Sequence, residues 1–161
     1  MLQLADKYNV KDLLQLGLDF MARNVAIAAK RNQIVSWYQF ATTCGYKDTS
    51  QLCLDFIKWN FEMVTESIDW PNMEHESLVK LLNCSDLVVH DEMGVFLKVE
   101  KWLEEQQRRM EETGEEDIDL HMENLVTSAI NCVRFPMMYP AQVRNFTKLY
   151  NVCFLHSCHI Y

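Results

Sequence analysis

The clearest hydrophobic pattern in the chain runs from Gln51 to Val64. At the period of an α-helix, most of its apolar side chains share one broad face. The residues expected on that face are Cys53, Phe56, Ile57, Asn60, Phe61 and Val64, with Leu52, Trp59 and Met63 widening it. The narrow polar stripe that remains consists of Gln51, Asp55, Lys58 and Glu62. A helix that is apolar over most of its circumference is normally buried by several neighbours, so the pattern predicts the central helix of an all-helical domain.

Shorter helical patterns lie on both sides of this stretch. They predict helices over residues 2–8, 11–24, 32–43, 74–83, about 91–107, 120–131 and 141–150, while residues 25–31 fit either a helix or a connector. Gly45 fits the left-handed position that ends a helix, and Pro71 breaks the chain after Trp70. Successive helices with such short connections pair as antiparallel hairpins. The predicted fold class is therefore all-α, built from antiparallel helical hairpins.

Composition supports one compact helical domain. The chain has 161 residues, 49% of them hydrophobic, and only 4 Gly and 3 Pro, which is few for an all-β protein. The net charge of −8 argues against a nucleic-acid partner, whose binding surface would be basic. Residues 104–119 hold eight acidic residues and two arginines, so much of the charge belongs to one segment. No run of 18 apolar residues exists, so no membrane span is expected.

The six cysteines leave two interpretations open. They are Cys44, Cys53, Cys84, Cys132, Cys153 and Cys158. An even number permits a disulfide framework, but a chain of this size folds without one, and buried free thiols are the interpretation that the sequence favours. The first ten residues lack the features of a signal peptide.

Five stretches follow one another in an order that resembles the BTB–BACK family. They are LADKYNVKDLLQLGLDFM, FATTCGY, CLDFIKWNFEMV, LVKLLNCSDLVVHDEMGVFLKVEKWL and VRFPMMYP. The first is similar to the last two helices of a BTB (BTB/POZ) domain, and the other four are similar to the BACK domain, also found in BTB–Kelch proteins. Within the family, CLDFIKWNFE and RFPMMYP look most like the galectin-3-binding protein branch, including its BTB-domain-containing relatives.

This resemblance implies a division of the chain. Residues 1–24 would be the C-terminal helices of a BTB domain, residues 25–146 a BACK domain, and residues 147–161 an unmatched C-terminal tail. It also implies a function, because the BACK domain is a non-enzymatic protein–protein interaction scaffold.

The family landmarks are expected to be structural. They are Phe56, Trp59, Phe61, Ser85, Asp86, Phe96, Trp102, Arg134 and Pro136. The side chains of Ser85 and Asp86 suit a turn, because they hydrogen-bond nearby backbone donors. Arg134 can reach helix-end carbonyls or an acidic partner, and Pro136 stops a helix. The tryptophans are expected in the core or at its edge.

The resemblance also implies partners. Many BTB–BACK proteins dimerise through the BTB domain and recruit a cullin of a cullin-RING ubiquitin ligase. Here the cullin contact would extend over residues 18–44, and the dimer would form through a BTB domain whose core this sequence lacks. The first hypothesis is therefore a cytoplasmic ubiquitin-ligase substrate adaptor. The alternative is a secreted adhesion or matrix glycoprotein resembling galectin-3-binding protein, which would be extracellular.

Chemistry-bearing motifs are few. Asn83-Cys84-Ser85 and Asn145-Phe146-Thr147 fit the N-glycosylation pattern, which applies if the protein is secreted. There is neither a glycine-rich phosphate loop nor a GxSxG elbow, so no catalytic residue, no cofactor and no enzyme is expected. The four residues Cys153, His156, Cys158 and His159 fit no compact zinc finger, so no metal site is expected.

Overall fold

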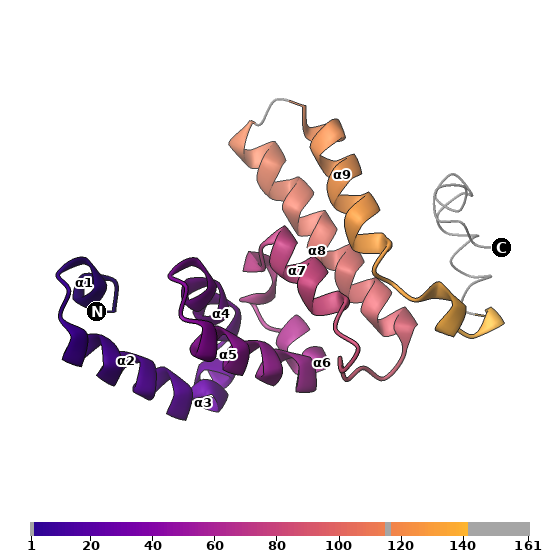
Figure 1. Cartoon of the computed structure of the whole chain (residues 1–161). Helices are drawn as coiled ribbons and strands as arrows, with labels where there is room; N and C mark the ends of the chain where they lie inside the picture. The colour runs from indigo at the N-terminus through magenta and orange to yellow at the C-terminus, as the bar shows by residue number, and fades with distance from the viewer. Residues whose placement is uncertain (1, 115–116, 142–161) are drawn as a thin grey trace. The chain divides into compact units, whose positions relative to one another are not determined.

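The computed structural model describes residues 2–114 and 117–141. Within these ranges the chain is helical and contains no strand, which confirms the predicted all-α class (Figure 1). The chain divides into two compact units, residues 1–74 and residues 75–161, here named the N-terminal and C-terminal units. No helix in the described part of the chain is long and apolar enough to cross a membrane.

The N-terminal unit is organised around one helix, as the hydrophobic pattern predicted. Its elements are α1 (Leu2–Lys7), α2 (Lys11–Arg23), α3 (Val25–Lys30), α4 (Ile34–Thr43), α5 (Lys47–Trp59), α6 (Phe61–Thr65) and the 3₁₀ turn η1 (Trp70–Asn72). Helix α5 packs against α2, α3, α4 and α6. The side chains of Cys53 and Ile57 on α5 are fully buried. The central helix of this unit is therefore α5.

Gly45 makes the α4–α5 hairpin. Its φ of 75° is left-handed, which costs glycine little. The Gly45 N–H donates to the carbonyl of Thr42 at 3.1 Å, and the Tyr46 N–H donates to that of Ala41 at 2.8 Å. These bonds satisfy carbonyls at the end of α4 and turn the chain back for α5, so the predicted helix end at Gly45 is confirmed.

The stretch from Gln51 to Val64 is not one helix, and that part of the prediction was wrong. Asn60 leaves the helical region with φ −122° and ψ 32°, which separates α5 from α6. Its side-chain Nδ2 donates to the carbonyl of Phe56 at 2.9 Å. Asparagine competes in this way for helical backbone acceptors. Phe56 is only half-buried, whereas Phe61 is buried on α6.

The expected width of the buried face was also wrong. Leu52, Trp59 and Met63 are 40%, 68% and 46% exposed. Lys58, expected on the polar stripe, is only 6% exposed. Its Nζ lies 2.7 Å from Oδ1 of Asp55. A buried lysine is tolerated when its charge is paired. The polar stripe is therefore buried at Lys58, while apolar side chains on the other side of the helix reach solvent.

The C-terminal unit contains a long helical hairpin. Its described elements are α7 (His75–Leu82), α8 (Glu92–Thr113), α9 (Ile118–Ile130) and the 3₁₀ turn η2 (Phe135–Met137). Helices α8 and α9 lie side by side and run antiparallel, and α7 packs against α9 (Figure 1). The core is built from Leu78, Leu81, Val99, Trp102 and Ala129. This arrangement confirms the predicted hairpin architecture.

Helix α8 begins as predicted and ends later than predicted. The carboxylate Oδ1 of Asp91 accepts a hydrogen bond from the N–H of Gly94 at 2.6 Å, so Asp91 caps the helix. The helix passes the expected end near Gln107 and continues to Thr113. Gly114 then ends it in the left-handed conformation, with φ 66°.

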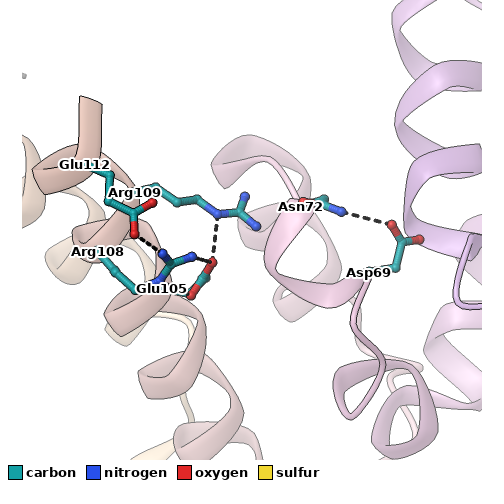
Figure 2. Close-up of polar contacts among 6 residues, drawn as sticks. All are labelled: Asp69, Asn72, Glu105, Arg108, Arg109 and Glu112. Atoms are coloured by element: carbon teal, nitrogen blue, oxygen red, sulfur yellow. Dashed lines mark hydrogen bonds and ion pairs between the residues drawn. The ribbon is translucent and has the colours of Figure 1, made fainter. Parts of the chain in front are cut away.

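Ion pairs line the extra turns of α8 (Figure 2). Glu105 accepts hydrogen bonds from Arg108 at 2.6 Å and 2.9 Å and from Arg109 at 3.0 Å, and Arg108 also pairs with Glu112. Pairs three and four residues apart support a helix weakly. Hydrogen bonds from Arg108 and Arg109 lower the pKa of the Glu105 carboxyl to about 2. The first part of the acidic segment 104–119 is therefore helical, up to Thr113.

Candidate interaction surface

Three of the nine family landmarks, Phe61, Phe96 and Trp102, are buried inside the two units. In the N-terminal unit the ring of Phe61 meets the edge of the Trp70 ring, with centroids 5.8 Å apart, and both side chains are buried. In the C-terminal unit, the ring centroids of Phe96 and Phe135 lie 6.3 Å apart. These residues fasten loops to helices, which leaves them no access to a partner.

Arg134 joins the segment after α9 to the beginning of α8 and the end of α7. Its backbone N–H donates to Oε2 of Glu92 at 3.2 Å, and its guanidinium lies 3.8 Å from Oε1 of the same carboxylate. Nη2 of Arg134 donates to the carbonyl of Cys84 at 3.1 Å. Both kinds of contact considered from the sequence are thus present. Pro136 differs from its prediction: α9 has already ended at Ile130, and Pro136 lies in the 3₁₀ turn η2.

The connection between α7 and α8 is exposed. Ser85 and Asp86 form a turn there, and both are open to solvent. Asn83, the first glycosylation candidate, is also exposed. Its Nδ2 donates to the carbonyl of Val79 at 3.0 Å and lies 3.4 Å from the Cys132 sulfur. Asn145, the second candidate, lies outside the described residues, as does the tail 147–161.

A histidine–serine pair in the C-terminal unit was missed by the sequence analysis. Nε2 of His75 lies 2.5 Å from the Ser128 hydroxyl, and the His75 ring faces Trp102 at 6.4 Å between centroids. The same hydroxyl donates to backbone carbonyls of α9, at Asn124 and Leu125. Because its proton is held by a helix carbonyl, Ser128 accepts from His75 and ties α7 to α9. No local sequence signal links residues 53 positions apart.

The thiols show no reactive site. The described cysteines Cys44, Cys53, Cys84 and Cys132 are free. Burial raises the pKa of the Cys53 thiol to about 11, so it stays protonated and inert near neutral pH. Among the residues that the structure describes, no group of three or more His, Cys, Asp or Glu side chains is arranged to hold a metal ion.

A groove of about 480 Å³ lies between α2 and the beginning of α5 in the N-terminal unit. One wall is formed by α2, through Gln15, Leu18, Asp19 and Ala22. The other is formed by the beginning of α5 and the residue before it, through Tyr46, Lys47, Asp48, Thr49 and Leu52. The lining mixes apolar side chains such as Leu18, Ala22 and Leu52 with charged and polar ones. The family resemblance implied a cullin contact over residues 18–44, which includes part of the α2 wall but not the α5 wall.

The α1–α2 pair exposes a second apolar surface in the same unit. The exposed side chains are Leu4, Tyr8, Val10, Leu13, Leu16 and Phe20. Phe20 touches Trp37 of α4 at 6.3 Å between ring centroids, and it is still mostly open to solvent. Soluble proteins rarely leave so many large apolar side chains together in water, so this face is suited to covering by further protein.

The two helical units contain packed hairpins and open apolar surfaces, and no metal cluster is found among the described residues. Open apolar surfaces on packed hairpins are the features of an interaction domain. The chain belongs to the BACK family, described as "BTB And C-terminal Kelch", which matches residues 34–148. This match confirms the family predicted from the sequence landmarks. Members of the family are interaction modules, and the chain is accordingly a protein–protein interaction scaffold.

The chain is also similar to parts of longer curated proteins. It is 28% identical over 146 residues to BTB/POZ domain-containing protein 17 of Xenopus laevis, covering 91% of this chain and 28% of the relative. The human protein of that name is 33% identical over 141 residues, covering 88% of this chain and 26% of the relative. Galectin-3-binding protein of Pongo abelii is 33% identical over 106 residues, covering 66% of this chain and 16% of the relative. The chain thus spans about a quarter or less of these relatives. No solved structure matches it.

Proposed function

We propose that the chain is the BACK portion of a BTB–BACK protein that serves as a substrate adaptor of a cullin-RING ubiquitin ligase. The α2–α5 groove is the observation that carries this proposal, because it offers an open groove of mixed apolar and polar lining that includes Leu18, Asp19 and Ala22 of the region 18–44. Membership of the BACK family and similarity to BTB/POZ domain-containing proteins support it.

The exposed face of α1 and α2 would be the contact between this scaffold and the rest of the larger protein. Large apolar side chains such as Leu16 and Phe20 are stabilised by removal from water, at about 25 cal/mol per Å² of buried apolar area. The remaining part of a BTB domain would cover this face. Residues 1–24 then act as the end of that domain and fix its orientation to the BACK helices.

The groove would receive a segment of the cullin. Leu18, Ala22 and Leu52 supply apolar contact, and Asp19 and Lys47 supply polar contacts at its walls. Substrate reading would be left to other parts of the protein. The scaffold's task is to hold cullin and substrate at fixed separation, which requires packed hairpins rather than a reactive group.

Replacing Ala22 with arginine is expected to block cullin binding. Ala22 is exposed in the groove wall, so the variant should fold while its long side chain fills the channel. In the full protein containing this chain, we expect at least about a tenfold loss of affinity for a purified cullin N-terminal domain, measured by calorimetry. Ala141→Arg, also exposed but outside both the groove and residues 18–44, is the matched control. Absence of binding by the unmodified protein, or equal losses in both variants, would count against the groove.

A secreted glycoprotein is the second candidate function. It is favoured by the similarity to galectin-3-binding protein and by the exposure of Asn83 within Asn83-Cys84-Ser85. If it holds, the protein isolated from its native cells loses mass on treatment with peptide N-glycosidase, and Asn83→Gln removes one glycan. A protein without any glycan contradicts this candidate. A glycan on Asn83 contradicts the ubiquitin-ligase role, because cullins act in the cytosol and nucleus.

A further inference from the structure

An apolar surface on α5 and α6 is left unexplained by the core, and only its Leu52 end also lines the groove. It consists of Leu52, Trp59 and Met63, here named the Trp59 surface. Leu52 and Trp59 lie two turns apart on α5, with half-buried Phe56 between them, and Met63 follows on α6. Trp59 is 68% exposed, which is unusual for so large an apolar side chain. Exposed aromatic side chains are frequent anchors of protein interfaces.

The charge around the Trp59 surface is negative. Between Ser50 and Glu74 the sequence has one basic residue, Lys58, and five acidic residues, of which Asp69 is buried and Asp55, Glu62, Glu66 and Glu74 reach solvent. In the Asp55–Lys58 pair the lysine side chain is 7% exposed and the aspartate side chain 42%. The carboxylate of Asp55 therefore reaches solvent, whereas the ammonium group of Lys58 is buried. Glu62 and Glu66 are exposed on and beside α6.

We propose that the Trp59 surface binds a positively charged amphipathic helix of a partner protein. The separation of Leu52 and Trp59 along α5 is about 10 Å, the length of two helical turns. A partner helix can cover it with apolar side chains at positions i, i+3 or i+4, and i+7. Lysine or arginine side chains beside that stripe would meet the carboxylates of Asp55 and Glu62. The negative end of the α5 dipole, next to Trp59, adds to the attraction.

Charge also decides against two other occupants. A second copy of this chain, related by a twofold axis, would bring two acidic rims together, and like charges across an interface are repulsive. An anionic membrane surface would be repelled in the same way. A basic amphipathic helix would bind through both parts of the surface, the apolar side chains and the carboxylates beside them. Trp59 and Met63 do not line the groove, so this partner and the proposed cullin segment would share only Leu52.

The test uses two synthetic helical peptides with the same leucine stripe. One carries lysines beside the stripe and the other carries glutamates at the same positions. Calorimetry with the whole chain should show binding of the lysine peptide, and at least about tenfold weaker binding of the glutamate peptide. Raising the salt from about 0.05 M to about 0.5 M should weaken the lysine peptide, because screening reduces its attraction to the rim. Equal binding of both peptides, or no binding of the lysine peptide, would overturn the proposal.

Variants locate the binding on this surface. Trp59→Ala should weaken the lysine peptide at least about tenfold and leave the circular dichroism melt unchanged, because Trp59 contributes little to the core. Tyr8→Ala, which removes an equally exposed aromatic just after α1 at 69%, is the matched control and should bind like the unmodified chain. The double variant Glu62→Gln, Glu66→Gln should reduce both affinity and salt dependence. Unchanged binding by Trp59→Ala would contradict the proposal, whatever the outcome for the cullin.

Discussion

Replacing Trp102 with alanine is expected to lower the free energy of unfolding of the C-terminal unit by about 3–5 kcal/mol. The indole is 1% exposed on α8, the long helix of the hairpin. Its ring faces His75, which in turn is bonded to Ser128 of α9. The substitution removes a large apolar side chain from the packing between α7, α8 and α9, and the space left behind cannot close without moving these helices.

Urea unfolding followed by circular dichroism measures the loss, and amide hydrogen exchange along α8 assigns it to the C-terminal unit. Leu97→Ala is the matched control, because Leu97 lies on the same helix and is 48% exposed. It should cost less than about 1 kcal/mol. Similar losses in the two variants would mean that Trp102 does not lie at the centre of the packing.

The burial of Trp102 could be predicted because α8 is one unbroken helix. Val95, Val99 and Trp102 recur at helical spacing, so a local pattern suffices to place them on one face. Asp91, the expected cap, and Gly45, the expected helix end, also act through neighbouring residues. Fold class and hairpin order follow from such local signals.

The same reasoning failed at Asn60, because this residue can either continue the helix or end it. The helical pattern continues through Asn60, but its side chain takes the Phe56 carbonyl and the backbone leaves the helix. Phe61 and Val64 beyond that point are still buried, as their spacing predicted, whereas Trp59 and Met63 reach solvent although their spacing placed them on the buried side.

The candidate surfaces depend on packing between distant segments, which no single period reveals. The groove needs α2 and α5 together, and the sequence indicated only the α2 part of it. Negative charge around Trp59 was visible in the sequence, but the orientation of the Asp55–Lys58 pair was not. Interaction surfaces are therefore less predictable than the core that supports them.

Asp69→Ala is expected to destabilise the N-terminal unit by about 2–4 kcal/mol, although aspartate in a loop is ordinarily dispensable. Asp69 is 3% exposed. Its Oδ2 accepts a hydrogen bond from the backbone N–H of Ser36 at 3.0 Å, and its Oδ1 accepts from the Ser36 hydroxyl at 2.6 Å. Asn72 also donates to Oδ1, at 3.1 Å (Figure 2).

The reason for the large effect is that Asp69 caps α4 from a distant loop. Ser36 is the third residue of α4, and N–H groups in a first turn have no partner within the helix. Gln33, at the usual capping position, makes no side-chain cap. Loss of the carboxylate leaves the Ser36 N–H and hydroxyl without this acceptor and also releases η1, whose Trp70 packs on Phe61.

Three further variants separate this cap from general loss of charge. Asp69→Asn should lose less than Asp69→Ala, because an amide oxygen still accepts from one donor. In a double-mutant cycle with Ser36→Ala, the two losses should overlap by at least about 1 kcal/mol, since both remove the same hydrogen bond. Asp48→Ala, which removes an exposed carboxylate from the first turn of α5, should cost less than about 1 kcal/mol. Additive losses for Asp69 and Ser36 would show that the carboxylate does not hold α4, and hydrogen exchange in the first turn of α4 would then stay unchanged in Asp69→Ala.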